Sequence, residues 1–312
     1  MAVKVMIMGE SGTGKSTSLR FLIPNLTGIV NPVNKPLPFR NQFKEEDMCN
    51  GVTDAKTIID HMDFWVNEGK KIIVIDDFQY ILSVPYMNRI KESGWDKWND
   101  FGANYFEIIK HCDNLPNDVI VFFMTHTETL EDGTTTIKLI GKLLREKITI
   151  EGLFTIVLKT GVNEGKYYFY TQNSGKDTVK SPLGMFNSYA IENDLYFVDK
   201  KIRNYYNMDG ALNDAEINKL DAEKAGEVEK PEPRSRKRTR GEVIKDNEEK
   251  VAEYVQKEAE AVEAAAEGDE EVVPFEEVKA PEAPKLEPVP RRSVEEATQE
   301  EAPKRRTRKP RA

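Results

Sequence analysis

The sequence predicts an α/β fold, a parallel sheet with helices on both faces, followed by a disordered, charged tail. Two observations support this prediction. Through the first 208 residues, short apolar runs bounded by breakers alternate with helical patterns, which is typical of parallel strands joined by crossover helices. Residues 209–312 instead contain 21 basic and 28 acidic residues, with Tyr254 and Phe275 as their only aromatic residues. Such a segment buries too little apolar surface to offset its ordering entropy.

The expected elements follow in chain order. Four strands fit a parallel sheet, at residues 3–8, 27–33, 71–77 and 118–126. Helical patterns lie between them at residues 15–23, 54–68 and 97–114. The later segments "LFTIVLKTG", "NEGK" and "YYFYTQ" predict an antiparallel hairpin joined across residues 162–166, and a last helix is expected near 193–207. The predicted domain is therefore residues 1–208, and the tail 209–312 has a possible helix near 248–267.

The segment "GESGTGKST" directly follows the first expected strand and matches the phosphate-loop template G-x-x-x-x-G-K-[ST] without a gap. Its glycines let backbone N–H groups turn toward phosphate oxygens at the start of a helix. Lys15 would add a charge at the β- and γ-phosphates, and Ser16 a hydroxyl ligand for Mg²⁺. The alternative is an ordinary glycine-rich turn. The residues expected to bind nucleotide are Gly9, Glu10, Ser11, Gly12, Thr13, Gly14, Lys15, Ser16 and Thr17.

A second nucleotide motif is expected in "KKIIVIDDF", where a buried strand ends in two carboxylates. Asp76 would hold Mg²⁺ directly or through water. Asp77 stands where many ATPases place the base that orients the attacking water. Glu45 and Glu46 compete for that role because they follow the second expected strand. A solvated turn is the alternative for both aspartates, and the sequence does not decide among the candidate bases.

His126 ends the apolar run "VIVFFMTH", at the edge of the sheet where the phosphates are expected. It could sense the γ-phosphate by hydrogen bonding, or it could be an ordinary strand-end side chain. His61 and His111 fall on helical patterns, so the three histidines do not suggest a metal site.

Composition narrows the class of protein. The chain has a formal net charge of −9 and two cysteines 63 positions apart, which is not a disulfide framework or a zinc site. No apolar run reaches 18 residues, and the first ten residues lack the features of a signal peptide. A cytoplasmic protein without a membrane span is expected.

The order of "GESGTGKST", "NPVNKPLPF", "IIVIDDFQYIL", "LPNDVIVFFMTHTE", "IGKLLREK" and "KSPLGMF" resembles the bacteriophage P-loop ATPases of the compact, single-domain RecA-like type. Several members serve as single-strand annealing or recombination proteins, and others of the AAA kind are known only as nucleotide-binding proteins. The resemblance covers residues 1–208. It implies ATP with Mg²⁺ as ligands, ATP hydrolysis, self-assembly into a ring or filament on single-stranded DNA, and the cytoplasm of the host cell.

The resemblance also implies cations that reach a neighbouring subunit's nucleotide. Lys142 and Lys180 are the preferred candidates, among the further cations Lys35, Arg40, Arg145 and Lys147. The alternative for each is a solvated surface side chain.

DNA contact is expected in residues 83–102, because cations and aromatic residues alternate there. The candidates are Tyr86, Arg89, Lys91, Trp95, Lys97 and Trp98. A lid or a subunit-packing helix is the alternative. In the tail, basic clusters at 234–240 and 304–311 are suited to phosphate backbones, and "DEEVVPFEE" could dock a replication or recombination protein or be a solvated linker.

Three function classes remain. The first is a DNA-stimulated ATPase of annealing or strand exchange, and the second is a helicase-loader-like accessory that ATP switches under control of a partner protein. A small-molecule kinase is disfavoured because the arginines gather in the tail rather than in a lid. A GTPase is disfavoured because neither "NK" pair continues into N-K-x-D.

Overall fold

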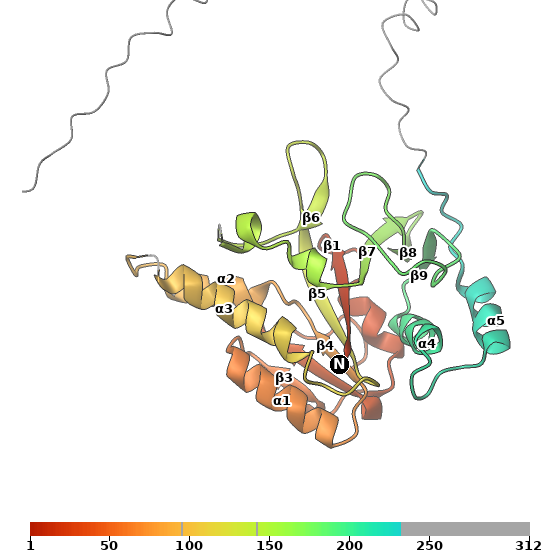
Figure 1. Cartoon of the computed structure of the whole chain (residues 1–312), viewed down its shortest axis with the longest axis horizontal. Helices are drawn as coiled ribbons and strands as arrows, with labels where there is room; N and C mark the ends of the chain where they lie inside the picture. The colour runs from red at the N-terminus through yellow and green to blue at the C-terminus, as the bar shows by residue number, and fades with distance from the viewer. Residues whose placement is uncertain (95, 142, 232–312) are drawn as a thin grey trace, which may run out of the picture. The chain divides into compact units, whose positions relative to one another are not determined.

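The computed structural model describes residues 1–94, 96–141 and 143–231 (Figure 1). In this part of the chain nine strands form one sheet in the order β3-β2-β4-β5-β1-β7-β8-β9, with β6 paired to β5. The strands are β1 (Val3–Gly9), β2 (Thr27–Asn31), β3 (Met48–Asn50), β4 (Ile72–Ile75), β5 (Ile120–Thr129), β6 (Thr135–Ile137), β7 (Ile156–Asn163), β8 (Lys166–Tyr170) and β9 (Ala190–Glu192).

The helices cover both faces of this sheet. The α-helices are α1 (Ala55–Asn67), α2 (Tyr80–Asn88), α3 (Asp96–His111), α4 (Leu195–Tyr205) and α5 (Asp214–Lys224). Short 3-10 turns are η1 (Ser16–Phe21), η2 (Pro24–Leu26), η3 (Glu45–Asp47) and η5 (Ile150–Leu153), and η4 (Leu143–Lys147) is a π-helical turn. Within the described residues, no helix combines the length and apolarity that a bilayer crossing requires.

The parallel strands place their carboxyl ends at one edge. β5 pairs in parallel with both β1 and β4, so it separates the strand before the phosphate loop from the strand before the two aspartates. Gly9 stands opposite His126 in the β1–β5 register. The predicted parallel sheet is confirmed, and its order brings three strand ends with polar residues together.

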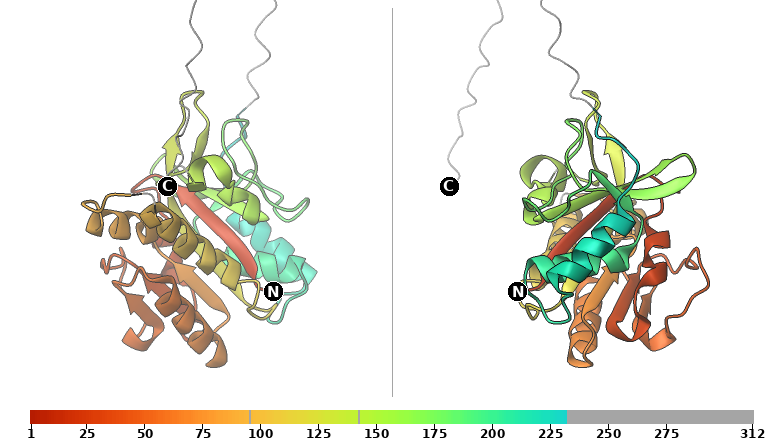
Figure 2. Two further views of the ribbon diagram at one scale, coloured as in Figure 1. Left: turned by 60° about the vertical axis from the view of Figure 1, so that its left-hand side comes forward. Right: turned by 90° about the vertical axis from the view of Figure 1, so that its right-hand side faces the viewer.

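Alternating side chains of the central strands divide the core into two layers. Met6 and Met8 face the layer of α1, α2 and α3, where Trp65 is fully buried. Val5 and Ile7 face the layer that includes η1, α4 and α5. Figure 2 shows β1 running through the middle between these two groups of helices. Burial on both faces explains why these strands are continuously apolar.

The predicted antiparallel hairpin is also present. β7 and β8 pair from Lys159–Tyr170 to Asn163–Lys166, and the turn between them uses Glu164 and Gly165 at positive φ. β9 then adds to β8. The strands β3, β6 and β9 were not predicted, because each has only three residues, too few for a periodic signal.

Ordered structure continues past the predicted boundary at residue 208. α5 begins at a capping box formed by Asn213 and Glu216, and its Ile217 is buried in the same layer as α4. The sequence missed this helix because it is polar on most of its surface. The possible helix near 248–267 and the basic clusters of the tail lie outside the described residues.

Candidate nucleotide-binding site

The loop after β1 has the backbone conformation that its glycines permit. Gly12 and Gly14 have φ of 79° and 99°, values at which other residues are strained. A Cβ at Gly12 would meet no atom within 4 Å, whereas one at Gly14 would come within 2.9 Å of the Tyr167 ring. Thr13 Oγ1 lies 2.6 Å from Thr160 Oγ1 of β7, which ties the loop to the sheet. The loop therefore forms a cradle, a curved backbone segment that is held against the sheet at Thr13 and is open beside Gly12.

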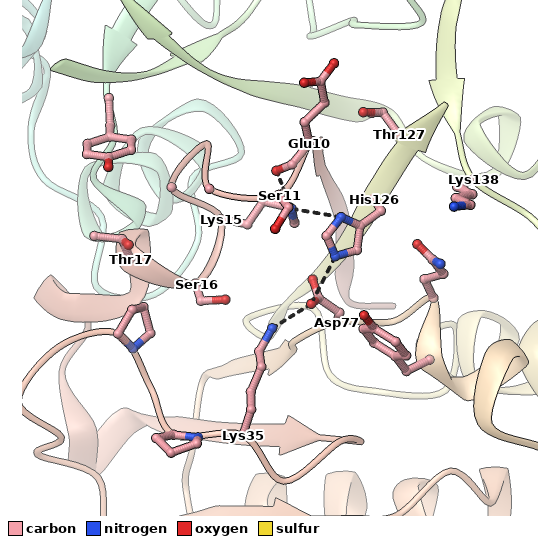
Figure 3. Close-up of a pocket in the computed structure, with 17 residues that line it drawn as sticks. Glu10, Ser11, Lys15, Ser16, Thr17, Lys35, Asp77, His126, Thr127 and Lys138 are labelled. Atoms are coloured by element: carbon pink, nitrogen blue, oxygen red, sulfur yellow. Dashed lines mark hydrogen bonds and ion pairs between the residues drawn. The ribbon is translucent and has the colours of Figure 1, made fainter. Parts of the chain in front are cut away.

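Lys15 lies across the mouth of this cradle. Its ammonium donates to the carbonyl oxygens of Gly9 and Glu10 at 2.9 and 2.8 Å. Burial lowers the pKa of Lys15, although the nearby carboxylates of Asp77 and Asp76 partly oppose this shift. Figure 3 shows the side chain pointing toward His126 across the cavity.

Ser16 and Asp76 form an oxygen pair that fits Mg²⁺. Ser16 Oγ donates to Asp76 Oδ1 at 3.0 Å, and Asp76 is buried. Burial and the charge of Asp77 raise the pKa of Asp76. Among the described residues no group of three or more His, Cys, Asp or Glu could hold a metal. Mg²⁺ still suits this pair, because it commonly takes one or two protein oxygens and completes its shell with waters and phosphates.

Asp77 makes different contacts from Asp76, to which it is joined by a cis peptide bond. Its Oδ2 accepts from Lys35 Nζ at 2.6 Å and lies 3.3 Å from His126 Nε2. Its buried Oδ1 has no hydrogen-bond partner among the residues that the structure describes. Burial opposes ionisation of Asp77, but the hydrogen bonds from His126 and Lys35 outweigh it and lower its pKa. Asp77 therefore lines the cavity with one oxygen shared by Lys35 and His126, while its other oxygen is buried without a partner among the described residues.

His126 bridges the two sides of the site. Its Nδ1 lies 3.5 Å from Lys15 Nζ, and its Nε2 faces Asp77. An ammonium can only donate, so Nδ1 accepts and the imidazole proton is on Nε2. Figure 3 shows the resulting row of Lys15, His126, Asp77 and Lys35.

Lys35 reaches this row from the chain after β2. Asn31, the last residue of β2, donates to Lys35 O at 2.9 Å and accepts from Lys35 N at 3.3 Å. From the sequence, Lys35 is only one of several candidate cations for the nucleotide of a neighbouring subunit. The signal that could have placed it is "NPVNKP", an amide side chain at a strand end followed by a proline-restricted turn.

Glu45 and Glu46 are not part of the site, so their prediction as the base is wrong. They lie in η3, which precedes β3, and β3 runs parallel to β2. Residues before a parallel strand lie at its amino end, so both side chains are at the edge of the sheet opposite the phosphate loop. They are exposed, and Glu46 pairs with Lys44. The short strand β3, which the sequence did not reveal, accounts for the error.

The cavity above the loop has a volume of about 790 Å³. The sequence missed Gln79, Tyr80, Lys138 and Tyr167 among its walls. Gln79 and Tyr80 closely follow Asp77, whereas Lys138 and Tyr167 lie after β6 and in β8, far from the two motifs. Of the cations predicted to reach a neighbouring subunit's nucleotide, Lys142 lies outside the described residues. Lys180 is exposed and does not line this cavity, and Arg145 pairs with Glu128. The walls consist of Glu10, Ser11, Gly12, Gly14, Lys15, Ser16, Thr17, Lys35, Pro36, Pro38, Asp77, Gln79, Tyr80, His126, Thr127, Lys138 and Tyr167.

Residues 83–102 make mostly internal contacts. Arg89 pairs with Glu92 and Asp100, and Trp98 packs against Tyr86. Lys97 is buried, while Trp95 lies outside the described residues. Arg89 and Trp98, two of the side chains predicted to contact DNA, thus have partners within the segment.

The strand order and the phosphate loop decide the fold. It is a RecA-like P-loop NTPase fold. No family model matches the chain, and no curated protein matches it. Among solved structures, the chain is similar to a KaiC-like protein of the hyperthermophilic archaeon Pyrococcus horikoshii, with 15% identity and a TM-score of 0.36 over 54% of this chain and 77% of that protein.

Proposed function

We propose that the chain binds ATP with Mg²⁺, hydrolyses it, and acts on single-stranded DNA in phage recombination, annealing or replication. One observation carries the nucleotide part of this proposal. Lys15, Asp77 and His126 come from the ends of three different strands and meet within hydrogen-bonding distance at one cavity. A merely structural glycine turn would not require this convergence.

The residues have complementary roles in this proposal. The loop and Lys15 hold the phosphates, and Ser16 with Asp76 would hold Mg²⁺, which stabilises charge on the transferring phosphoryl group. Asp77, which lines the cavity, would accept a hydrogen bond from the attacking water. A lowered pKa suits this positioning role, because phosphoryl transfer through a loose transition state needs little proton abstraction. His126, between Lys15 and Asp77, reports whether a γ-phosphate is present.

The DNA part rests on the resemblance and on the sequence of the tail. The basic clusters at 234–240 and 304–311 would bind phosphate backbones without sequence preference. In the folded part, Lys138 and Lys147 are exposed beyond the end of β5, the strand that carries His126. Self-assembly would place exposed Lys180 against the nucleotide of a neighbouring copy.

The test is steady-state ATP hydrolysis with and without single-stranded DNA, beside Lys15→Ala and a chain shortened to residues 1–231. We expect hydrolysis that depends on Lys15 and increases with DNA. Loss of the stimulation in the shortened chain would assign DNA affinity to the tail. Hydrolysis that depends on Lys15 but ignores DNA would contradict the DNA part alone. It would favour the helicase-loader-like switch, whose signature is turnover that depends on a partner protein.

A further inference from the structure

A second cavity of about 390 Å³ adjoins the phosphate cavity. Tyr167 lines both, and its ring lies beside Gly14 of the phosphate loop. Thr17, the last residue of the loop motif, lines the first cavity, and its carbonyl accepts from Arg20 at 2.9 Å in the second. The two cavities therefore lie side by side, sharing Tyr167 as a wall residue beside the phosphate loop.

The walls of the second cavity suit an uncharged aromatic ring. Three acidic and three basic side chains line it, so no surplus of positive charge would attract further phosphate. Two tyrosines, Tyr167 and Tyr168, supply aromatic surface, and Tyr167 remains 42% exposed. Flat ring systems stack on such side chains.

Hydrogen bonds connect the inner wall of the second cavity to the phosphate loop. Arg20 donates to Asn193 Oδ1 at 3.2 Å as well as to Thr17. Asn193 is fully buried, lies beside Gly14, and its Nδ2 has no partner in the part of the chain that the structure describes. A shift of Arg20 or Asn193 would therefore disturb the phosphate loop at Thr17 or Gly14.

The outer wall is a short strap, residues 225–227, that follows α5. Gly226 N donates to Ala190 O at 2.8 Å, and Ala225 forms a bridge with Ile191. Lys224, just before the strap, lies 2.8 Å from Glu192 and 3.0 Å from Asp194. A Cβ on Gly226 would come within 2.9 Å of the Tyr168 ring and 3.0 Å of the Ala190 carbonyl oxygen, so the strap fits here only as glycine.

Given the proposed nucleotide function, we infer that the second cavity receives the purine base, stacked on Tyr167, and that the strap 225–227 closes over it. The base of ATP is the ligand, and its phosphates remain in the first cavity. The strap connects α5 with the charged tail, so occupancy of the base cavity and the position of the strap are linked. Displacing the strap weakens the hold on the base and leaves the hold on the phosphates unchanged.

The experiment compares the binding of ATP with that of inorganic tripolyphosphate, both with Mg²⁺, by calorimetry on the full chain. Gly226→Ala displaces the strap. Gly152→Ala is the matched control, because its Cβ would approach no atom closer than 3.7 Å. We expect Gly226→Ala to weaken ATP binding about tenfold, in line with the loss of one base-stacking contact. Tripolyphosphate affinity should stay unchanged, as should both affinities of Gly152→Ala.

Lys224→Ala provides a second variant in case Gly226→Ala fails to fold, because it removes the ion pairs with Glu192 and Asp194 at the start of the strap, and it should show the same selective loss. Equal loss of both ligands, or no loss of either, would overturn the inference. So would a wild-type protein that binds tripolyphosphate as tightly as ATP. A wild-type protein that binds neither ligand would instead contradict the proposed function, which separates the two failures.

Discussion

The parallel and antiparallel halves of the sheet build their parts of the cavity system differently. In the parallel half, β1, β5 and β4 run in one direction and deliver Lys15, His126 and Asp77 to a common edge. In the antiparallel half, the walls around Tyr167 come from β8, β9 and the segment after α5. Strand direction brings the three side chains of the first region to one edge, whereas the second region is closed by a segment outside any strand, the one that follows α5.

The largest expected effect tests the parallel half. Lys15→Ala should reduce ATP turnover on the order of 1000-fold, since it removes the charge that the cradle aims at the phosphates. Hydrolysis assays measure the loss, and circular dichroism should show an unchanged fold. The exposed Lys56 of α1 supplies the control, as Lys56→Ala should leave turnover intact. Equal losses in the two variants would contradict the assignment.

Asp77→Asn comes next, with an expected loss of roughly 300-fold in kcat. The amide keeps the shape of the side chain but removes its charge, and it places an NH₂ group either against Lys35 or at the buried Oδ1 position. ATP binding should change little, because Ser16 and Asp76 remain. Rapid-mixing kinetics would separate binding from turnover, and a variant with normal kcat would exclude Asp77 from water positioning.

The closed interior of the parallel half predicts slow thiol chemistry. Burial raises the pKa of Cys49 to about 11 and that of Cys112 to about 12. A thiol whose pKa lies two units higher contains about 100-fold less of the reactive thiolate at pH 8. Alkylation followed by mass spectrometry should therefore show little labelling of the native protein at pH 8, a rate that increases with pH, and rapid labelling in denaturant. Fast alkylation of Cys49 or Cys112 in the native protein would mean that the parallel half of the sheet unfolds locally at a high rate.

The smallest effect is expected at the opposite edge of the sheet. Glu45→Gln and Glu46→Gln should each keep turnover within about twofold of wild type, as exposed side chains away from special contacts usually do. The same hydrolysis assay checks this, with Asp77→Asn beside it. A large loss at either glutamate would return it to the list of candidate bases.

The sequence predicted the parallel half well because its signals are local. An apolar run that ends in polar residues marks both the strand and the residue at its end, as for Asp76 and His126. The error at Glu45 and Glu46 arose where a three-residue strand left no periodic pattern. Lys138 and Tyr167 could not be assigned, because no local pattern shows which side chain a neighbouring strand or the segment after it will carry into a cavity.

The place of β5 between β1 and β4 has a consequence for the width of the site. Neighbouring strands lie about 4.8 Å apart, so the strand ends that carry the phosphate loop and Asp77 are separated by two such spacings, or roughly 10 Å. This distance is set by backbone hydrogen bonds and not by any side chain. The imidazole of His126 lies between the two strand ends, so replacement of that ring would remove its contacts with Lys15 and Asp77 without changing the separation of those ends.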